Sequence, residues 1–316
     1  NISNYLLLMK EGILVDQGQP KKVFSDLSHP YTKKLFSASS EQFSFKETNP
    51  SKEKLLEVRS VSVKYRSHER GIFSKGKSVE AVSNVSLDIR KGERLGLVGE
   101  SGCGKSTLTR TILGLQSASS GSIKFDGQEV SKYANSFKKN IQVVFQDPYG
   151  SFNPRQKIGR LITEPFFTLG REAPPETEQR IIAQKMLKEV GLSSESIEKY
   201  IHEFSGGQRQ RIAIARALVI KPKLIIFDEA VSALDVSIRT QILKLISNLT
   251  ERYGLSYLFI SHDLTVIENI TENCLVMKNG KIVERGQTKH ILRDPKNEYT
   301  LSLINAAPKF PNFLHA

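Results

Sequence analysis

Apolar residues recur along this chain with the spacing of strands. The stretches 56–63 and 79–89 hold apolar residues at near-alternate positions, which is typical of half-buried strands. Shorter continuous apolar runs at 94–98, 224–227 and 257–260 indicate strands that are buried on both faces. These runs together predict a mostly buried sheet.

Helical spacing separates some of these strands. Apolar residues recur at helical intervals in 107–115, and the segment 177–190 has the pattern of an amphipathic helix. Strands that alternate with helices predict an α/β domain, which we place at residues 55–316. No apolar run approaches the roughly 18 to 20 residues needed to span a bilayer.

The first residues of the chain repeat the last ones. Residues 1–38 align without a gap on residues 269–306, with 15 identities among the 38 pairs. Each copy places a glycine, Gly12 or Gly280, between two apolar runs. The repeated unit therefore reads as strand, turn, strand and short helix.

The offset of this repeat, 268 residues (269 minus 1), is the length of a whole domain. We therefore expect residues 1–40 to be the C-terminal tail of a preceding domain of the same kind, which makes the chain a piece of a longer tandem polypeptide. The alternative is an N-terminal extension that happens to resemble the tail. Residues 41–54 are polar and charged and include Pro50, so a linker is expected there.

Composition narrows the class of protein. Of 316 residues, 39% are hydrophobic and 25% are charged, as in ordinary soluble globular proteins. Cys103 and Cys274 are far apart and have no metal-ligand spacing, so we expect a cytoplasmic chain without a disulfide framework. The net charge of +13 fits nucleic acid, an anionic membrane surface or a solvated lysine-rich exterior, and the scattered lysines favour the last.

A phosphate-binding loop follows the predicted strand at 94–98. It matches the pattern Gly-x-x-x-x-Gly-Lys-Ser and leads directly into a predicted helix. Its glycines let backbone N–H groups wrap phosphates, and the helix directs its positive end at them. We expect Lys105 to lie between the β- and γ-phosphates of a nucleotide, and the Ser106 hydroxyl to bind Mg²⁺. The loop residues are Gly99, Glu100, Ser101, Gly102, Cys103, Gly104, Lys105, Ser106 and Thr107.

Two adjacent carboxylates end the apolar strand at 224–227. We expect Asp228 to hold the Mg²⁺ shell and Glu229 to polarise the attacking water, although adjacent acids can also form a capped turn. His262 follows the strand at 257–260, at the sheet edge where the phosphate loop emerges and where ligands bind in open α/β sheets. It is expected to contact the γ-phosphate, the alternative being a purely structural histidine.

A second anion-binding pattern lies at Ser205, Gly206, Gly207 and Gln208. These small residues precede an apolar helical stretch and so predict a helix N-terminus. One ATPase domain does not need two phosphate sites 100 residues apart (205 minus 105). The second site is therefore expected to serve the ATP of another subunit.

With these motifs the chain resembles the ATP-binding cassette (ABC) transporter ATPases, and Ser205–Gln208 matches their signature motif although Phe204 replaces the commoner leucine. The resemblance implies a P-loop NTPase fold of the α/β class, with a RecA-like core and an antiparallel β subdomain. It also implies an α-helical subdomain at about 148–213 and a C-terminal extension at about 288–316. Two such domains face each other head to tail, and each ATP lies between one phosphate loop and the opposite signature.

The resemblance assigns roles to further positions. Tyr65 corresponds to the aromatic residue that stacks on adenine. Gln146 corresponds to the glutamine that senses Mg²⁺ and the attacking water, so that it joins Lys105, Glu229 and His262 in catalysis. Asp235 ends the segment 232–235, which crosses the dimer interface in the family.

The wording of several motifs is narrower and resembles the oligopeptide, dipeptide and nickel importer ATPases. The segments that carry it are 99–107, 145–155 and 228–237, with Tyr299-Thr300 in the tail. The resemblance covers the 262 residues that follow the linker (316 minus 54). The N-terminal piece resembles the tail of the same subfamily through His29-Pro30-Tyr31-Thr32.

The function implied is that of an ATP-hydrolysing subunit, using ATP and Mg²⁺, which energises an importer of peptides or related solutes, nickel or a metallophore included. The expected partners are a second ABC ATPase domain, integral membrane permease subunits and, indirectly, an extracytoplasmic solute-binding protein. No nucleic acid is expected, and the site of action is the cytoplasmic face of the membrane.

Two other classes of ATP-binding protein fit the sequence less well. A soluble cassette ATPase acting on ribosomes or DNA would, by resemblance, carry Asn-His-Leu-Asp at 232–235 and an arginine at 264, where this chain has Ser-Ala-Leu-Asp and Leu264. A small-molecule kinase would leave the signature motif unexplained.

Overall fold

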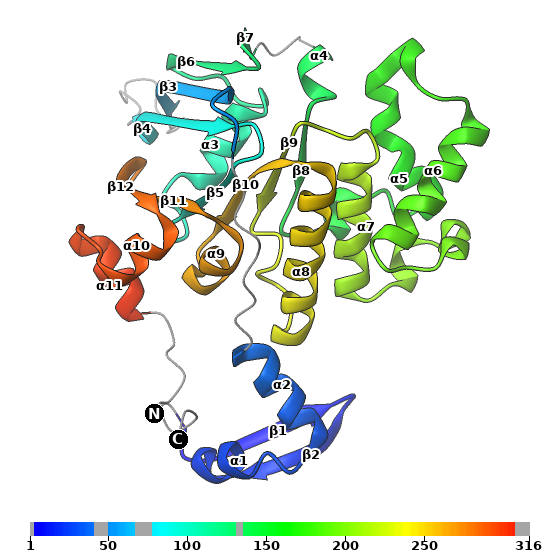
Figure 1. Ribbon diagram of the computed structural model, residues 1–316, viewed down its shortest axis with the longest axis vertical. Coiled ribbons are helices and arrows are strands. Elements are labelled where there is room, and N and C mark those ends of the chain that lie inside the picture. The colour runs from blue at the N-terminus through cyan, green and yellow to red at the C-terminus, as the bar shows by residue number, and fades with distance from the viewer. Residues whose placement is uncertain (1–2, 41–49, 67–77, 131–134, 307–316) are drawn as a thin grey trace, which may run out of the picture.

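A six-stranded sheet forms the centre of the computed structural model, which describes residues 3–40, 50–66, 78–130 and 135–306 (Figure 1). Five of its strands run parallel, and the last strand pairs antiparallel at one edge. In sheet order the strands are β12 (Lys281–Gln287), β11 (Asn273–Lys278), β5 (Arg94–Val98), β10 (Ser256–Ser261), β9 (Leu224–Asp228) and β8 (Ile141–Val144). This is the predicted RecA-like core, and β5, β9 and β10 match the continuous apolar runs.

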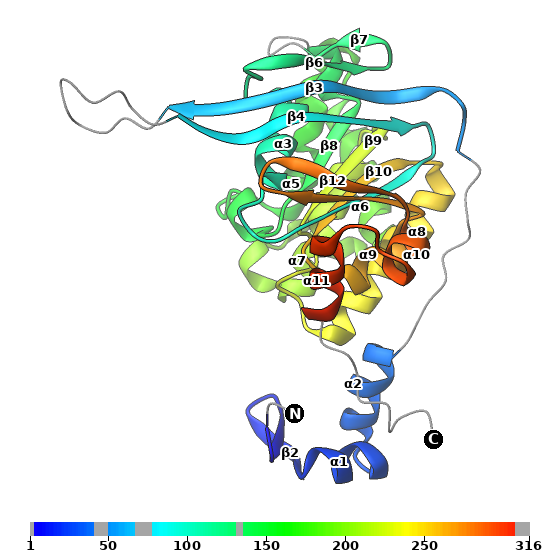
Figure 2. The same ribbon diagram turned by 90° about the vertical axis from the view of Figure 1, so that its left-hand side faces the viewer.

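An antiparallel sheet lies beside the first, as predicted for the β subdomain. Its order is β4 (Ser78–Arg90), β3 (Lys54–Arg66), β6 (Ser120–Phe125) and β7 (Gln128–Glu129). Figure 2 shows the long strands β3 and β4 crossing the molecule above the central sheet. Their buried faces share one core with α3 (Lys105–Ile112), which includes Leu56, Val82 and Leu108.

Other helices cover the central sheet. These are α8 (Val236–Tyr253), α9 (Leu264–Ile270), α10 (Thr288–Arg293) and α11 (Glu298–Ala306), with the short α4 (Asn135–Lys138) before β8. The helix predicted at 107–115 begins two residues earlier than expected, at Lys105, and ends at Ile112 because Gly114 takes a left-handed conformation (φ 67°). No described helix has the length and apolar character that a membrane crossing requires.

Helices between β8 and β9 gather on one side of the core, at the right of Figure 1. The amphipathic segment predicted at 177–190 is α6 (Glu176–Glu189), which buries Ala183, Met186 and Leu187. The group consists of η1 (Tyr149–Ser151), α5 (Ile158–Thr163), η2 (Glu164–Glu172), α6, η3 (Ser194–Glu198), η4 (Ile201–Glu203) and α7 (Gly206–Leu218).

The repeated N-terminal unit folds like its C-terminal counterpart. It contains β1 (Leu6–Lys10), β2 (Ile13–Gly18), α1 (Pro20–Asp26) and α2 (Pro30–Ser40), in the order of β11, β12, α10 and α11. Both hairpins shift register at equivalent positions, between Leu8 and Met9 and between Val276 and Met277. The strand–turn–strand–helix reading of the repeat is therefore confirmed, and each copy has a second short helix.

The two copies differ in what covers them. In the C-terminal copy β11 pairs with β5, whereas among the described residues β1 pairs only with β2. Leu7 and Met9 are 59% and 60% exposed, but their counterparts Leu275 and Met277 are buried. The unit lies below the rest of the chain in Figure 1, where α2 lies against α8. The predicted linker falls mostly within 41–49, which is outside the described residues.

Candidate functional site

The phosphate-binding loop connects the buried strand β5 to α3. Gly102 and Gly104 have φ values of 83° and 109°, which favour glycine over any residue with a Cβ atom. Gly104 is the residue that precedes the first turn of α3. The loop therefore turns sharply enough to direct the backbone N–H groups of residues 104–107 towards one point.

Two glycines of the loop are needed because the backbone of other segments lies against them. A Cβ atom on Gly99 would approach the carbonyl oxygen of Met277 to 2.2 Å, and one on Gly104 would approach that of Ala81 to 2.3 Å. The N–H of Gly280 also donates to the carbonyl of Cys103 at 2.8 Å. The turn of the hairpin β11–β12 and strand β4 thus hold the loop from outside.

Lys105 is buried in the loop that it belongs to, with 4% of its side chain exposed. Its ammonium group donates to the carbonyls of Gly99 at 2.7 Å and Glu100 at 2.9 Å. It also lies 3.9 Å from the Glu229 carboxylate. The sequence placed Lys105 and Glu229 in one site, and the structure brings them together.

The carboxylates and the histidine come from the ends of neighbouring parallel strands. Val98 pairs with Ser261 and Ile260 pairs with Asp228, so the loop, His262 and Glu229 leave the sheet at one edge. His262 Nδ1 lies 3.3 Å from Glu229 Oε2. This edge is the predicted position of the site.

The conformation of Glu229 is unusual. Its φ is 51°, a region that non-glycine residues rarely adopt, and its backbone N–H donates to the carbonyl of Ile260 at 3.0 Å. Asp228 is partly buried at the end of β9, where burial, and then the negative charge of Glu229, raise the pKa of its carboxyl group. A buried carboxylate with a raised pKa beside a lysine is suited to a cation that offsets its charge.

Tyr65 lies beside the first turn of α3. Its hydroxyl group donates to Thr107 Oγ1 at 3.4 Å, and its ring is partly exposed. The strand β3 thus carries an aromatic ring to the loop, at the position predicted for adenine stacking. Ser106 and Thr107 lie in the same helical turn as Lys105.

Gln146 is exposed and follows β8 by two residues. Because Val144 pairs with Phe227, Gln146 emerges at the same edge of the sheet as Asp228. Within the described residues no hydrogen bond joins its side chain to Glu229, His262 or Lys105. The structure brings Gln146 to the edge but shows no hydrogen bond from it to the other predicted catalytic groups.

The signature residues lie at the N-terminus of α7, and among the described residues no hydrogen bond or ion pair joins them to the phosphate loop. Ser205 and Gln208 form a capping box, in which the Gln208 N–H donates to Ser205 Oγ and the Ser205 N–H donates to Gln208 Oε1 at 3.0 Å. A Cβ atom on Gly207 would meet Ile238 of α8 at 2.5 Å. Asp235 caps that neighbouring helix by accepting a hydrogen bond from the Ile238 N–H at 3.0 Å.

Two residues with clear contacts were missed from the sequence, one at the phosphate loop and one in the helical group. The Glu100 N–H donates to the hydroxyl of Tyr299 at 3.1 Å. Arg216 of α7 donates to Ser151 O at 2.7 Å and lies 4.3 Å from the centroid of the Phe152 ring. Tyr299 stood out only as part of a tail motif, and Arg216 had no signal beyond its place in an apolar helix.

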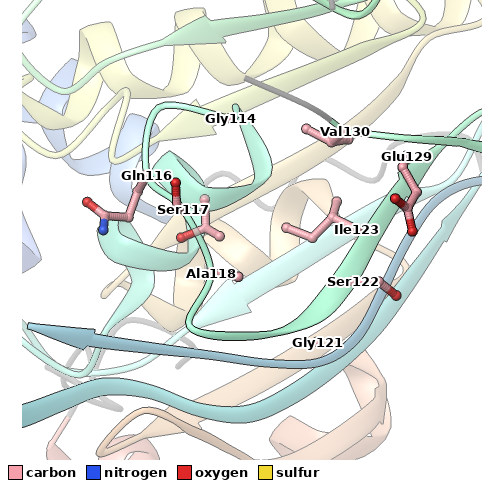
Figure 3. A pocket seen from close by; sticks show the side chains of 10 residues that line it. Gly114, Gln116, Ser117, Ala118, Gly121, Ser122, Ile123, Glu129 and Val130 are labelled. Atoms are coloured by element: carbon pink, nitrogen blue, oxygen red, sulfur yellow. The ribbon is translucent and has the colours of Figure 1, made fainter. Parts of the chain in front are cut away.

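Two cavities lie outside the phosphate loop. One of about 230 Å³ lies where α3 ends and β6 begins, lined by residues such as Gly114, Ser117 and Ile123 (Figure 3). Another of about 470 Å³ lies between the core and the helical group, beside Phe145, Phe167 and Arg216. The second is next to the segment that contains Gln146.

A nucleotide and a magnesium ion fit the residues of this edge. Gly102 has open space where a Cβ atom would stand, so phosphate oxygens have access to the loop backbone. Ser106 and Asp228 offer hydroxyl and carboxylate oxygens, the hard donors that Mg²⁺ prefers when phosphates supply its other ligands. The described residues contain no cluster of three or more His, Cys, Asp or Glu that could hold a metal without a nucleotide.

Comparison with known proteins supports the resemblance to ABC transporter ATPases. Residues 82–232 match a family model described as ABC transporter. A second model, described as the C-terminal region of oligopeptide/dipeptide transporters, matches twice, at 15–58 and 283–313. The two matches begin at equivalent positions of the repeat, Val15 and Val283, and each continues past the end of its copy.

The chain is 41% identical to the dipeptide transport ATP-binding protein DppF of Haemophilus influenzae, covering 84% of this chain and 82% of that relative. It is 38% identical to the glutathione import ATP-binding protein GsiA of Salmonella paratyphi A, covering 98% of this chain but 54% of that relative.

Among solved structures, a dimer of the ATP-binding cassette MJ0796 bound to ADP and Pi is similar, with a TM-score of 0.65 and 27% identity over 74% of this chain and 99% of that one. The similarity to this fold, the phosphate loop and the two family models all point to the same family. The chain therefore belongs to the ABC transporter family of ATP-binding proteins.

Proposed function

We propose that this chain hydrolyses ATP to power the import of peptides or related solutes across a membrane. ATP-binding subunits of this family hydrolyse ATP to drive transport, and this chain is an ATPase of that kind. The observation that carries the proposal is the convergence of Lys105, Glu229 and His262 at the sheet edge where the phosphate loop begins. The relatives named for dipeptide, oligopeptide and glutathione transport support the solute class.

In the proposed site the loop binds the phosphates of ATP. Its residues, Gly99 to Thr107, present backbone N–H groups, and Lys105 adds a positive charge between the β- and γ-phosphates. Tyr65 stacks on the adenine ring. Ser106, Asp228 and Gln146 hold Mg²⁺, which offsets phosphate charge when it is bound.

Glu229 is the proposed general base. Its carboxylate lies between Lys105 and His262, and it can accept a proton from a water molecule that attacks the γ-phosphate. His262 and Gln146 orient that water and the γ-phosphate. Lys105 stabilises the negative charge that is spread over the phosphate oxygens as the bond to the leaving group breaks.

A second ATPase domain completes each site in this proposal. Ser205, Gly206 and Gln208 are exposed at the N-terminus of α7, next to the buried Gly207, so this helix end is available to an ATP held by a partner. Asp235 follows on the segment that crosses the interface. The dimeric state of the MJ0796 cassette supports this arrangement.

The membrane partner is proposed to be a permease that docks in the 470 Å³ cavity. Phe167, which is 86% exposed, lines this cavity together with Phe145, next to Gln146. Arg216 of the signature helix also lines this cavity and donates a hydrogen bond to the carbonyl oxygen of Ser151. A permease segment bound in this cavity would contact both the segment that contains Gln146 and the signature helix. The contact would lie at the cytoplasmic face of the membrane, and a solute-binding protein would act on the opposite side.

We also propose the domain organisation that the repeat suggests. Residues 1–40 form a second copy of the C-terminal region, 41–54 form a linker, and 55–316 form the nucleotide-binding domain. The two matches of the C-terminal family model support the first assignment. The exposed Leu7 and Met9, at positions where the other copy is buried against β5, suggest that β1 belongs against a similar core.

Co-purification tests the transport proposal against the ribosome- or DNA-directed alternative, which the named relatives do not favour. The tagged chain, expressed in its own cells, should be recovered from membranes together with permease subunits, and the membrane fraction should hydrolyse ATP. Recovery with ribosomes or nucleic acid and not with membrane proteins would contradict the proposal.

A further inference from the structure

The hydroxyl of Tyr299 reaches the phosphate-binding loop from outside the nucleotide-binding core. Tyr299 lies in the first turn of α11, and only 6% of it is exposed. Its hydroxyl oxygen accepts a hydrogen bond from the Glu100 N–H at 3.1 Å, although 199 residues separate the two in sequence. A residue of the C-terminal region thus contacts the loop backbone directly.

The same peptide unit is held at its other end by Lys105. The Gly99–Glu100 peptide offers its N–H to Tyr299 and its carbonyl oxygen to the Lys105 ammonium group, at 3.1 and 2.7 Å. Hydrogen bonds in such a chain polarise and strengthen one another. The Tyr299 hydroxyl and the Lys105 ammonium group, which we assign to the phosphates, therefore fix the orientation of the same peptide from its two ends.

The Tyr299 ring is fixed on several sides. Lys278 Nζ lies 4.5 Å from the ring centroid, and the Tyr299 N–H donates to Asn297 Oδ1 at 2.9 Å. Glu284 accepts hydrogen bonds from the backbone N–H groups of Lys296 and Asn297, which holds the start of α11 on the hairpin. Burial raises the pKa of the Tyr299 hydroxyl, so it is neutral at physiological pH.

We propose that Tyr299 is a positioning residue of the ATP site, whose hydroxyl preorganises the phosphate loop and Lys105 for nucleotide binding. This inference rests on the proposed function of the loop. Without the hydroxyl, the partly buried Glu100 N–H loses its acceptor, and the Gly99–Glu100 peptide is held only through its carbonyl oxygen, by Lys105. ATP binding must then order the loop, so the loss falls on affinity and not on the chemical step.

The N-terminal repeat supplies a matched control. Tyr31 stands at the position equivalent to Tyr299, its N–H donates to His29 Nδ1 at 3.2 Å, and Lys10 Nζ lies 5.7 Å from its ring centroid. Among the described residues β1 of this unit pairs only with β2, whereas β11 pairs with β5, the strand that leads into the phosphate loop. Tyr31→Phe thus makes the same chemical change in a similar local setting away from the ATP site.

Steady-state ATPase assays of the full-length chain test the inference. Tyr299→Phe keeps the ring and should raise KM for ATP by about 2- to 10-fold, the effect of one neutral hydrogen bond, with kcat changed less than about 2-fold. Tyr31→Phe should match the unmodified chain. An unchanged KM, or a fall in kcat alone with a lower unfolding temperature, would show a structural role and overturn the inference.

Two further measurements keep the outcomes distinct. Lys105→Ala should lose hydrolysis. If it does, and Tyr299→Phe has a normal KM for ATP, only the role of Tyr299 is wrong. Normal turnover in both variants would mean that the ATP site itself is misplaced. Hydrogen exchange on the nucleotide-free unmodified chain should find the Glu100 amide more slowly exchanging than that of Gly102. Equal exchange rates would mean that the Tyr299 hydrogen bond is not formed.

Discussion

The carboxylate of Glu229 lies 3.3 Å from the imidazole of His262, although the two residues end different strands of the sheet. The contact exists because β9 and β10 are parallel neighbours in register, with Ile260 opposite Asp228. Glu229 also takes a left-handed backbone conformation (φ 51°), which carries its side chain towards both His262 and Lys105. Strain of this kind is often retained at functional sites.

The first prediction concerns the proposed general base. Glu229→Gln keeps the shape of the side chain but cannot accept a proton, so hydrolysis should fall by about 10² to 10⁴-fold. ATP binding should persist, because the loop and Lys105 are unchanged. Single-turnover hydrolysis and equilibrium nucleotide binding measure the two effects separately, and near-normal turnover would refute the assignment.

The second prediction uses two glycines that differ in their surroundings. Gly104→Ala places a methyl group 2.3 Å from the carbonyl of Ala81, so the loop must shift and ATP binding should be lost. Gly127 has a similar left-handed φ of 78° but nothing within 4 Å of a Cβ atom. Gly127→Ala should therefore cost only about 1 to 2 kcal/mol of unfolding free energy.

Nucleotide binding and thermal unfolding of both glycine variants provide the comparison. The expected pattern is loss of binding in Gly104→Ala and normal binding in Gly127→Ala. If both variants bind ATP equally well, the close contact with Ala81 does not shape the loop.

Much of the fold was predictable because its signals are local. The apolar runs predicted β5, β9 and β10, and the spacing of glycines predicted the phosphate loop between β5 and α3. The common exit of Glu229 and His262 followed from the parallel order of buried strands. The repeat gave the hairpin of residues 6–18 from its similarity to 273–287.

Contacts between distant segments were not predictable in the same way. Nothing local in the sequence places Tyr299 against Glu100 or Met277 against Gly99, since both depend on how β11 and α11 pack on the core. The separation of the signature helix from the phosphate loop was expected on functional grounds and not from spacing. Within the described residues Gln146 makes no hydrogen bond to the other predicted catalytic groups, so its role stays a prediction.

The third prediction follows from the burial of Asp228. Burial raises the pKa of its carboxyl group, so the folded chain binds this proton more tightly than the unfolded chain does. Stability is therefore lost as pH rises from the unfolded pKa of about 3.9 towards the higher folded pKa, and the cost is fully present once the pH exceeds the folded pKa.

Asp228→Asn removes that cost. The nucleotide-free variant should unfold at a higher temperature than the unmodified chain at pH 7, and the difference should shrink as pH approaches 4. Mg²⁺-dependent hydrolysis should be lost in the same variant. Thermal unfolding across pH tests the first effect, and a variant less stable than the unmodified chain at pH 7 would contradict it.

The fourth prediction concerns the signature motif. Ser205→Arg places a long cation at the N-terminus of α7, where it should abolish hydrolysis at the site completed by this helix while nucleotide binding to the monomer persists. Because Ser205 also caps α7, Ser205→Asn is a control that keeps a capping oxygen. Failure of the Arg variant to bind ATP as a monomer would mean that the signature acts within its own chain.

The last prediction separates membrane coupling from catalysis. Phe167 lines the 470 Å³ cavity and is 86% exposed, whereas Ile181 of α6 is 65% exposed and does not line it. Burying a phenylalanine side chain at an interface contributes about 1.5 to 3 kcal/mol, and a carboxylate at the same place opposes burial. Phe167→Glu should therefore reduce recovery with permease subunits by at least about 10-fold. It should leave the ATPase activity of the purified chain unchanged, because Phe167 is not one of the proposed phosphate-binding or catalytic residues. Ile181→Glu should have no effect on either measurement, and equal loss of recovery in both variants would mean that the permease does not dock in this cavity.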